Sequence, residues 1–183
     1  MPWSLKRFHE SGQTHFVTFS CYQRRPLFLT DTSKQTFESA LERIRRSYPL
    51  CVYGYVVMPE HVHLLLSEPQ QGTLAEALKS LKQGVSRRLI AEAEHFWQKR
   101  YYDLNIRNHS QFVEKLRYIH CNPVKRGLCE RPEDWEWSSF LHYATGRKGQ
   151  VEIESEWTAR GRERTAGKLC PAWKLPHSSQ NQA

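Results

Sequence analysis

The chain has 183 residues, of which 27 are Lys or Arg and 19 are Asp or Glu, so its formal net charge is +8 and its pI is about 9.4. This length suits one domain with its own hydrophobic core. No apolar run approaches the ~20 residues that a membrane-spanning helix needs, and the first residues lack the apolar segment of a secretion signal. We therefore expect a cytoplasmic protein without membrane contact. The five cysteines form no C-x-x-C pair, which argues against a disulfide framework and a cysteine-based zinc site.

The excess of positive charge favours a polyanionic partner, although a solvated basic surface also explains the net charge. The placement of the basic residues is more informative than their sum. Basic pairs recur next to aromatic or loop positions, a pattern suited to holding the phosphates and stacking the bases of a single nucleic-acid strand. The basic residues that we expect to contact the nucleic acid are Arg24, Arg25, Arg87, Arg88, Lys99 and Arg100.

The N-terminal part of the chain predicts one strand and one helix. Residues 15–23 alternate in polarity and are rich in β-branched and aromatic side chains, which indicates a strand. Residues 31–49 have apolar side chains at helical spacing and end at Pro49, so we expect a helix there. A capping box from Thr32 to Gln35 is expected to begin this helix.

The remaining elements follow in the same way. Residues 50–59 and 61–69 are two apolar stretches with a tight connection, which predicts an antiparallel pair of strands. Residues 73–92 carry leucines at helical spacing and predict a second helix. Residues 96–107 indicate a fourth strand, and residues 110–128 a third helix.

The order β-α-β-β-α-β followed by a helix is typical of an α+β fold of the ferredoxin-like, split βαβ type. We expect one antiparallel sheet with two helices on one face, and an added C-terminal helix that carries catalytic residues. The other face of the sheet remains available for a site. We place this domain at residues 1–145. Residues 146–183 are polar and are expected to form a weakly ordered extension.

The stretch MPEHVHLLL places His61 and His63 on one face of a predicted strand, while Val62 and Leu64 face the core. Residues two apart on a strand lie about 6.6–7 Å apart at the backbone, which lets two imidazoles converge on one ion above the sheet. The alternative is that both are polar residues on a half-solvated face. Burying two imidazoles without partners is costly, so we favour a metal site.

A third ligand and a reacting group are expected on the third predicted helix. At a period of 3.6 residues, Gln111, Lys115, Tyr118 and Asn122 lie on one polar stripe, apart from the apolar stripe that packs inward. The Asn122 amide oxygen as a ligand and the Tyr118 phenol as a nucleophile could face the same ion.

Two features leave this assignment open. Pro123 disfavours helical geometry at the residue before it, so Asn122 could instead lie at a kink or a cap. Tyr101 and Tyr102 compete with Tyr118 for any chemical role.

Several segments together resemble the single-tyrosine HUH transposases, in particular the REP-associated tyrosine transposases; HUH denotes histidine, a bulky apolar residue and histidine. These segments are HFVTFSCYQRRPLF, YVVMPEHVHLLL, FWQKRYYDLNIRN, YIHCNPVKRGL and DWEWSSF, within residues 15–142. The resemblance implies an enzyme of ferredoxin-like fold that cuts and rejoins single-stranded or hairpin DNA, as a monomer or a homodimer. It also implies metal binding by His61, His63 and Asn122 and nucleophilic attack by Tyr118.

The implied chemistry needs a divalent cation, Mg²⁺ or Mn²⁺, next to the scissile phosphate. The Tyr118 oxygen is expected to form a 5′-phosphotyrosine and release a 3′-hydroxyl, and a second strand end can then reverse the step. His120 lies nearby in sequence, and we expect it to pack or to support the site rather than to bind the metal.

Three other functions would also use some of these sequence features. A zinc deaminase is disfavoured, because the H-x-E and P-C-x-x-C signature is absent. A non-catalytic, ferredoxin-like nucleic-acid-binding module explains the fold and the charge but leaves the histidine pair without a role. A domesticated relative that nicks hairpin DNA without mobilising itself would share all of these sequence features.

Overall fold

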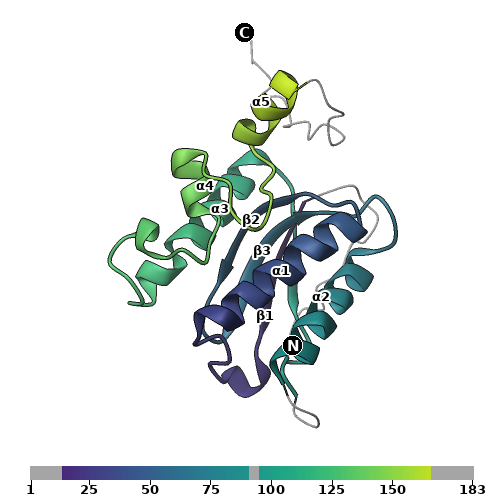
Figure 1. Ribbon diagram of the computed structural model, residues 1–183, viewed down its shortest axis with the longest axis vertical. Helices are drawn as coiled ribbons and strands as arrows, with labels where there is room; N and C mark the ends of the chain where they lie inside the picture. Colours follow the sequence, from purple (N-terminus) through teal and green to yellow (C-terminus); the bar gives the residue numbers. More distant parts are fainter. Residues whose placement is uncertain (1–13, 91–94, 166–183) are drawn as a thin grey trace.

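The computed structural model describes residues 14–90 and 95–165 and is built on one four-stranded sheet (Figure 1). Its strands pair antiparallel in the order β2-β3-β1-β4. Their bounds are β1 Thr14–Ser20, β2 Val52–Val57, β3 His61–Ser67 and β4 Tyr102–Ile106. This order, with helices between β1 and β2 and between β3 and β4, confirms the predicted α+β, split βαβ fold. In the part of the chain just named, no helix is both long and apolar enough to span a bilayer.

One face of the sheet is covered by α1 Asp31–Ser47 and α2 Leu74–Leu89, which lie side by side (Figure 1). Between them and the sheet lies the larger hydrophobic core, to which β3 contributes Val62, Leu64 and Leu66. Because side chains alternate along a strand, the histidines of β3 point to the opposite face. The alternation read from the sequence therefore holds for this strand.

Threonine caps set where the two core helices begin. Thr73 and Glu76 form a reciprocal capping box at the start of α2. At α1, the Thr30 hydroxyl accepts a hydrogen bond from Ser33 N at 3.1 Å. The predicted cap at Thr32 was wrong by two residues, because the chain becomes helical at once after Thr30 and Thr32 already lies in the first turn.

The third helix, α3 His109–Lys125, lies on the opposite face of the sheet. Its apolar residues Phe112, Leu116 and Ile119 pack against a second, smaller cluster of buried side chains. The helix comes close to β2 at Gly54, where an added Cβ atom would lie 2.6 Å from Leu116 Cδ1. The predicted apolar stripe thus determines which side of α3 rests on the sheet.

Two short segments run along the outer edge of β2. Ser139 N donates to Tyr55 O at 3.0 Å, and Glu154 N donates to Val52 O at 2.8 Å. These contacts satisfy backbone groups that an edge strand would otherwise expose. The elements that hold the segments are η2 Pro132–Asp134, α4 Phe140–Thr145 and α5 Glu156–Thr165.

The described part of the predicted extension contributes to the domain. Val151 and Ile153 are each 2 % exposed and belong to the larger core. We expected residues 146–165 to lie outside the domain and to be weakly ordered. Because residues of this stretch contact β2 and the core, we propose that it forms part of the domain. Residues 166–183 lie outside the described part.

We predict that Gly54→Val lowers the free energy of unfolding by about 1–3 kcal/mol, because its branched side chain would collide with Leu116 and push α3 from the sheet. Denaturant unfolding measures this. Gly54→Ala should cost less, since the nearest atom is the end of a flexible side chain. Gly149→Ala is the matched control, because nothing lies within 4 Å of its added Cβ. A Gly54→Val protein as stable as the parent would contradict the close packing of α3 on β2.

Candidate metal centre

The face of the sheet opposite α1 and α2 carries an open hollow of about 450 Å³. It lies between the histidine-bearing strand, the adjacent β1 and the C-terminal half of α3. Its lining residues are Phe16, Thr18, Arg24, His61, His63, Tyr102, Lys115, Tyr118, Asn122 and Arg126. The structure therefore brings together all four residues predicted for metal binding and nucleophilic attack.

The two imidazoles converge through the same ring nitrogen. His61 Nε2 and His63 Nε2 lie 3.0 Å apart. The other nitrogens are held by neighbours: His61 Nδ1 is 3.0 Å from Glu60 Oε1, and His63 Nδ1 is 2.7 Å from Thr18 Oγ1. A histidine that donates its Nδ1 proton to such a partner keeps the Nε2 lone pair for a metal.

Both histidines are only 4 % exposed, and burial lowers their pKa values. The pKa of His63 falls to about 3, mainly because of burial; the charges of Arg126 and Arg24, and a proton on His61 when it is present, disfavour protonation of His63 further. The pKa of His61 is also lowered by burial, although the Glu60 carboxylate opposes the shift. Both rings are therefore neutral at pH 7, which is the form that binds a metal ion.

Helix α3 places Asn122 and Tyr118 beside the histidines. Asn122 Nδ2 lies 3.3 Å from His63 Nε2, while Asn122 Oδ1 is buried and has no hydrogen-bond partner among the residues described. The Tyr118 ring centroid is 5.1 Å from that of His63. The Tyr118 side chain is 39 % exposed, so the phenol remains accessible from the hollow.

Pro123 does not interrupt α3, which continues to Lys125. Asn122 therefore lies inside the helix, one turn after Tyr118, and the two side chains face the same way. This answers the alternative of a kink or cap at Asn122. The helix ends at Lys125, two residues after Pro123; Arg126 is the C-cap residue, and Gly127 follows with a positive φ of 68°.

The donor atoms fit a divalent ion. Two ligands at right angles around an octahedral ion, each ~2.1 Å from it, lie about 3.0 Å apart, which matches the separation of the two Nε2 atoms. The unpaired Asn122 Oδ1 could supply an oxygen ligand; leaving such an atom buried without a partner costs about 1–3 kcal/mol. The described residues contain no group of three His, Cys, Asp or Glu that could hold a metal, so the amide is the third protein ligand that the hollow offers.

The rim of the hollow is positively charged. Arg126 forms an ion pair with Glu60, the carboxylate that contacts His61. Partial burial would raise the pKa of Glu60, but its contacts with His61 and Arg126 outweigh this effect and lower the pKa. Lys125 Nζ lies 5.7 Å from the centre of the Tyr118 ring. An anionic group that entered the hollow would meet the phenol and these positive charges together.

Of the six basic residues predicted to contact DNA, only Arg24 lines the hollow. It belongs to the turn η1 Tyr22–Arg24 that follows β1, where it adopts a positive φ of 53°. The other five are exposed and lie outside this lining, and their contact with DNA stays a prediction. They are Arg25, Arg87, Arg88, Lys99 and Arg100.

The competing tyrosines lie on different faces of the sheet. Tyr101 packs against the core below α1 and α2, whereas Tyr102 lines the same hollow as Tyr118. Tyr102 contacts Phe16, with ring centroids 6.3 Å apart, and has no ring contact with the histidine pair. Tyr118 is therefore the better placed of the two tyrosines in the hollow, and its role as the nucleophile stays a prediction.

Sequence reasoning missed three residues of the site. Arg126 continues the four-residue spacing of Tyr118 and Asn122, and Glu60 directly precedes His61. The sequence could therefore have indicated both residues. Thr18 had none, because its place opposite His63 follows only from the pairing register of β1 with β3.

His120 lies outside the lining of the hollow, as expected for a packing role. Its Nε2 is 2.8 Å from Ser139 Oγ, which connects α3 to the segment along the edge of β2. Burial lowers the pKa of His120 to about 4, so this imidazole stays neutral at pH 7.

Comparison with known proteins gives a consistent result. The family described as "Transposase IS200 like" matches residues 9–122, a range that includes all four predicted site residues. A REP-associated tyrosine transposase of Escherichia coli K12 is 29 % identical over 136 residues, which cover 74 % of this chain and 81 % of that protein. A Haemophilus influenzae protein placed provisionally in the same group is 30 % identical over 150 residues, covering 75 % of this chain and 85 % of that one.

A solved structure has the same fold. It is that of a REP-associated tyrosine transposase bound to a REP hairpin, and it superposes with a TM-score of 0.69 at 26 % sequence identity. The match covers 82 % of this chain and 90 % of that one.

We predict that Thr18→Val weakens Mn²⁺ binding about 10- to 100-fold, because it removes the group that orients the His63 ring. Calorimetric titration of the purified protein with Mn²⁺ measures this. Thr36→Val is the matched control, because it replaces the same side chain at an exposed position of α1. Equal Mn²⁺ affinities for Thr18→Val and the parent protein would show that Thr18 does not support the centre.

Proposed function

Because the chain belongs to the IS200-like transposase family, we propose that it is a metal-dependent endonuclease and strand transferase for single-stranded DNA. It acts in the cytoplasm on hairpin-forming repeat DNA, through a 5′-phosphotyrosine intermediate. The observation that carries this proposal is the convergence of two imidazoles, an orphaned amide oxygen and an accessible phenol in one hollow. The likeness to a transposase solved with a REP hairpin supports hairpin DNA as the substrate.

His61, His63 and Asn122 would hold a divalent ion, Mg²⁺ or Mn²⁺, through the two Nε2 atoms and Oδ1. Mn²⁺ accepts imidazole ligands more readily than Mg²⁺ does. When bound, the ion polarises the phosphoryl oxygens and stabilises the charge that develops on them. Glu60 and Thr18 keep both rings in the orientation this requires.

Tyr118 supplies the nucleophile. Its hydroxyl oxygen forms a bond to the scissile phosphorus as the bond from phosphorus to the 3′ oxygen breaks. The phenol loses its proton, and the leaving 3′ oxygen gains one. The phosphotyrosine retains the energy of the phosphodiester, so the 3′-hydroxyl of another strand end can attack it and restore a DNA bond without ATP.

The basic rim positions the DNA backbone. Arg24 and Arg126 offer guanidinium groups that match phosphate geometry, and Lys115 adds a point charge beside Phe16. These groups bind phosphates without reading sequence, so affinity should fall as salt rises. The rival hypothesis of a non-catalytic binding module accounts for the charge but gives no role to the histidine pair, the phenol or the orphaned amide.

Tyr118→Phe should lower covalent attachment to single-stranded DNA by a factor of about 10³ or more, because the attacking oxygen is removed. Binding of uncut DNA should persist, since the ring keeps its contacts with Phe16 and His63. Denaturing gels with an oligonucleotide labelled at its 3′ end measure this, because the tyrosine retains the fragment on the 3′ side of the cut. Tyr102→Phe is the control within the same hollow. Attachment that survives Tyr118→Phe and disappears with Tyr102→Phe would move the nucleophile to Tyr102.

Removal of the metal should abolish cutting while DNA binding persists. We expect EDTA to stop cleavage and added Mn²⁺ to restore it in the parent protein but not in His61→Ala, which lacks one ligand. His109→Ala, at the exposed start of α3, serves as the control and should behave like the parent. Cleavage that continues in EDTA would refute the metal centre.

A further inference from the structure

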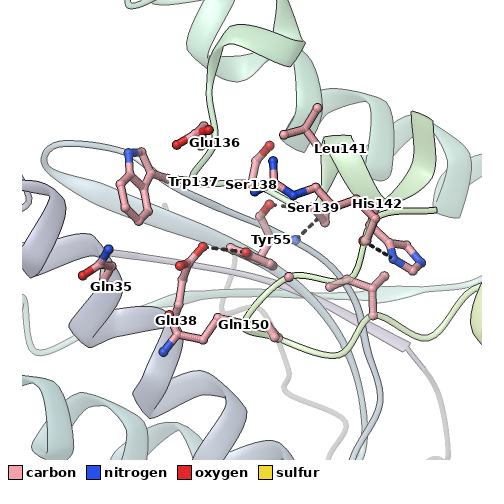
Figure 2. Close-up of a pocket in the computed structure, with 14 residues that line it drawn as sticks. Gln35, Glu38, Tyr55, Glu136, Trp137, Ser138, Ser139, Leu141, His142 and Gln150 are labelled. Atoms are coloured by element: carbon pink, nitrogen blue, oxygen red, sulfur yellow. Dashed lines mark hydrogen bonds between the residues drawn. The ribbon is translucent and has the colours of Figure 1, made fainter. Parts of the chain in front are cut away.

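A second cavity, of about 220 Å³, lies beside the outer edge of β2 (Figure 2). Its walls come from α1, β2, the segment 136–142 and the segment 147–153. It shares no lining residue with the hollow that contains the histidine pair. The cutting mechanism therefore gives this cavity no role.

A buried carboxylate lines the cavity. Glu38 is 6 % exposed, and one of its oxygens accepts a hydrogen bond of 2.6 Å from the Tyr55 hydroxyl, drawn as a dashed line in Figure 2. Its other oxygen receives no hydrogen bond from any residue in the described part of the chain. This oxygen is not one of the fully buried side-chain atoms that lack a partner, so it faces the cavity that Glu38 lines and can accept hydrogen bonds from a ligand that brings donors.

The cavity lining carries charges of both signs: the carboxyl groups of Glu38 and Glu136 and the guanidinium of Arg147. Burial, and then the nearby Glu136 carboxylate, raise the pKa of Glu38, which shows that two acidic groups share this space. The chain as a whole carries a net charge of +8. The two carboxyl groups offer hydrogen-bond acceptors to the cavity, so they favour a ligand that brings N–H donors.

The other walls suit a flat, polar ring. Trp137 is half-buried and lines the cavity, with one contact to the Lys34 ammonium at 5.3 Å from its ring centre. Indole faces bind nucleobases by stacking. Gln35 and Gln150 lie at the rim (Figure 2), and each side-chain amide can donate and accept hydrogen bonds. The volume has room for one base.

Guanine fits the carboxylate best among the DNA bases. Unpaired bases expose their Watson–Crick edges to proteins, and guanine presents N1–H and N2–H₂ side by side on that edge. Adenine and cytosine present one amine next to an acceptor nitrogen, which a carboxylate repels, and thymine presents one N–H between two carbonyls. Two parallel N–H donors are also what makes arginine a strong partner for carboxylates.

We propose that this cavity binds an unpaired guanine of single-stranded DNA, with Glu38 accepting hydrogen bonds from its Watson–Crick edge and Trp137 lying against the ring. The inference rests on the proposed function, because it takes single-stranded DNA as the ligand. A cationic side chain of a partner protein could also meet the two carboxylates. Guanine is favoured, because the overall positive charge attracts DNA to this chain and repels cationic partners.

The cavity wall is connected to the catalytic helix. Ser139, which lines the cavity, accepts a hydrogen bond from Tyr55 N at 3.1 Å, and its Oγ lies 2.8 Å from His120 Nε2. His120 lies between Tyr118 and Asn122 on α3. A bound guanine would thus have a fixed position relative to the nucleophile, and it would set the number of nucleotides between the recognised base and the cut.

The test compares short oligonucleotides that differ in one base. Thymine pentamers with guanine, inosine, adenine or thymine at the centre are titrated by fluorescence anisotropy in EDTA, so that no cutting contributes. Inosine lacks only the N2 amine. The parent protein should bind the guanine pentamer about tenfold more tightly than the others, since a bidentate base contact typically gives such discrimination.

Glu38→Gln should remove this preference, so that the guanine pentamer and the all-thymine pentamer bind with equal affinity. The new amide can still accept the Tyr55 hydrogen bond, but its NH₂ group repels the guanine donors. Glu130→Gln makes the same charge change at an exposed site outside both cavities and should keep the preference. A preference that persists in Glu38→Gln would overturn the proposal.

A second measurement needs no variant. Photo-crosslinking with a pentamer that carries 8-azidoguanine, followed by mass spectrometry, should label the peptide that spans residues 134–150. Labelling confined to other peptides would overturn the proposal. So would equal affinity for all four pentamers; if the guanidinium compound agmatine then bound in a Glu38-dependent way, the cavity would be assigned to a cationic partner.

The same protein distinguishes the two proposals. Covalent DNA attachment without any guanine preference would reject the guanine cavity alone. A Glu38-dependent guanine preference without covalent attachment would support the cavity and reject the cutting mechanism.

Discussion

The packing of α3 against the sheet is the constraint on which the rest of the site depends. The helix meets β2 at Gly54, where the absence of a side chain lets Leu116 approach, and Ile119 is fully buried on the same side. Once this apolar stripe is packed, the helical period determines where the neighbouring polar stripe of α3 lies. Tyr118 and Asn122 must then lie over His63. The chemistry of the centre is thus a consequence of how one amphipathic helix rests on one strand.

Burial and charge make the hollow suited to a cation. The two imidazoles are kept neutral by burial and by the positive charges of Arg24 and Arg126, and the same positive charges favour an anionic substrate. An unpaired amide oxygen remains beside them. Each of these features is unfavourable in a protein that binds nothing, and together they are consistent with a cation and a phosphate in the hollow.

The two proposals assign different parts of a DNA strand to the two hollows. The basic rim around the histidines suits the backbone, whereas the carboxyl groups in the cavity beside β2 suit a base with N–H donors. The segments that cover the edge of β2 build the second cavity and also protect the sheet from pairing with other chains. Val151 and Ile153 anchor one of these segments in the core, so the chain after residue 145 takes part in both tasks.

Much of this protein was determined by local sequence. Alternation along β3 predicted that His61 and His63 share a face, and helical periodicity predicted that Tyr118 and Asn122 share a stripe, because these patterns depend only on backbone geometry. The order of elements likewise predicted the fold. The start of α1 was misplaced, since Thr30 and Thr32 both have a capping side chain and only the course of the chain decides between them.

Only the tertiary structure decided what pairs across the sheet and what lies along its edge. Thr18 opposite His63, Arg126 beside Glu60, and Glu38 joined to Tyr55 in the second cavity all link residues that are far apart in sequence. No local period encodes such contacts. They arise when strand register and helix packing are fixed together by burial of the two hydrophobic clusters.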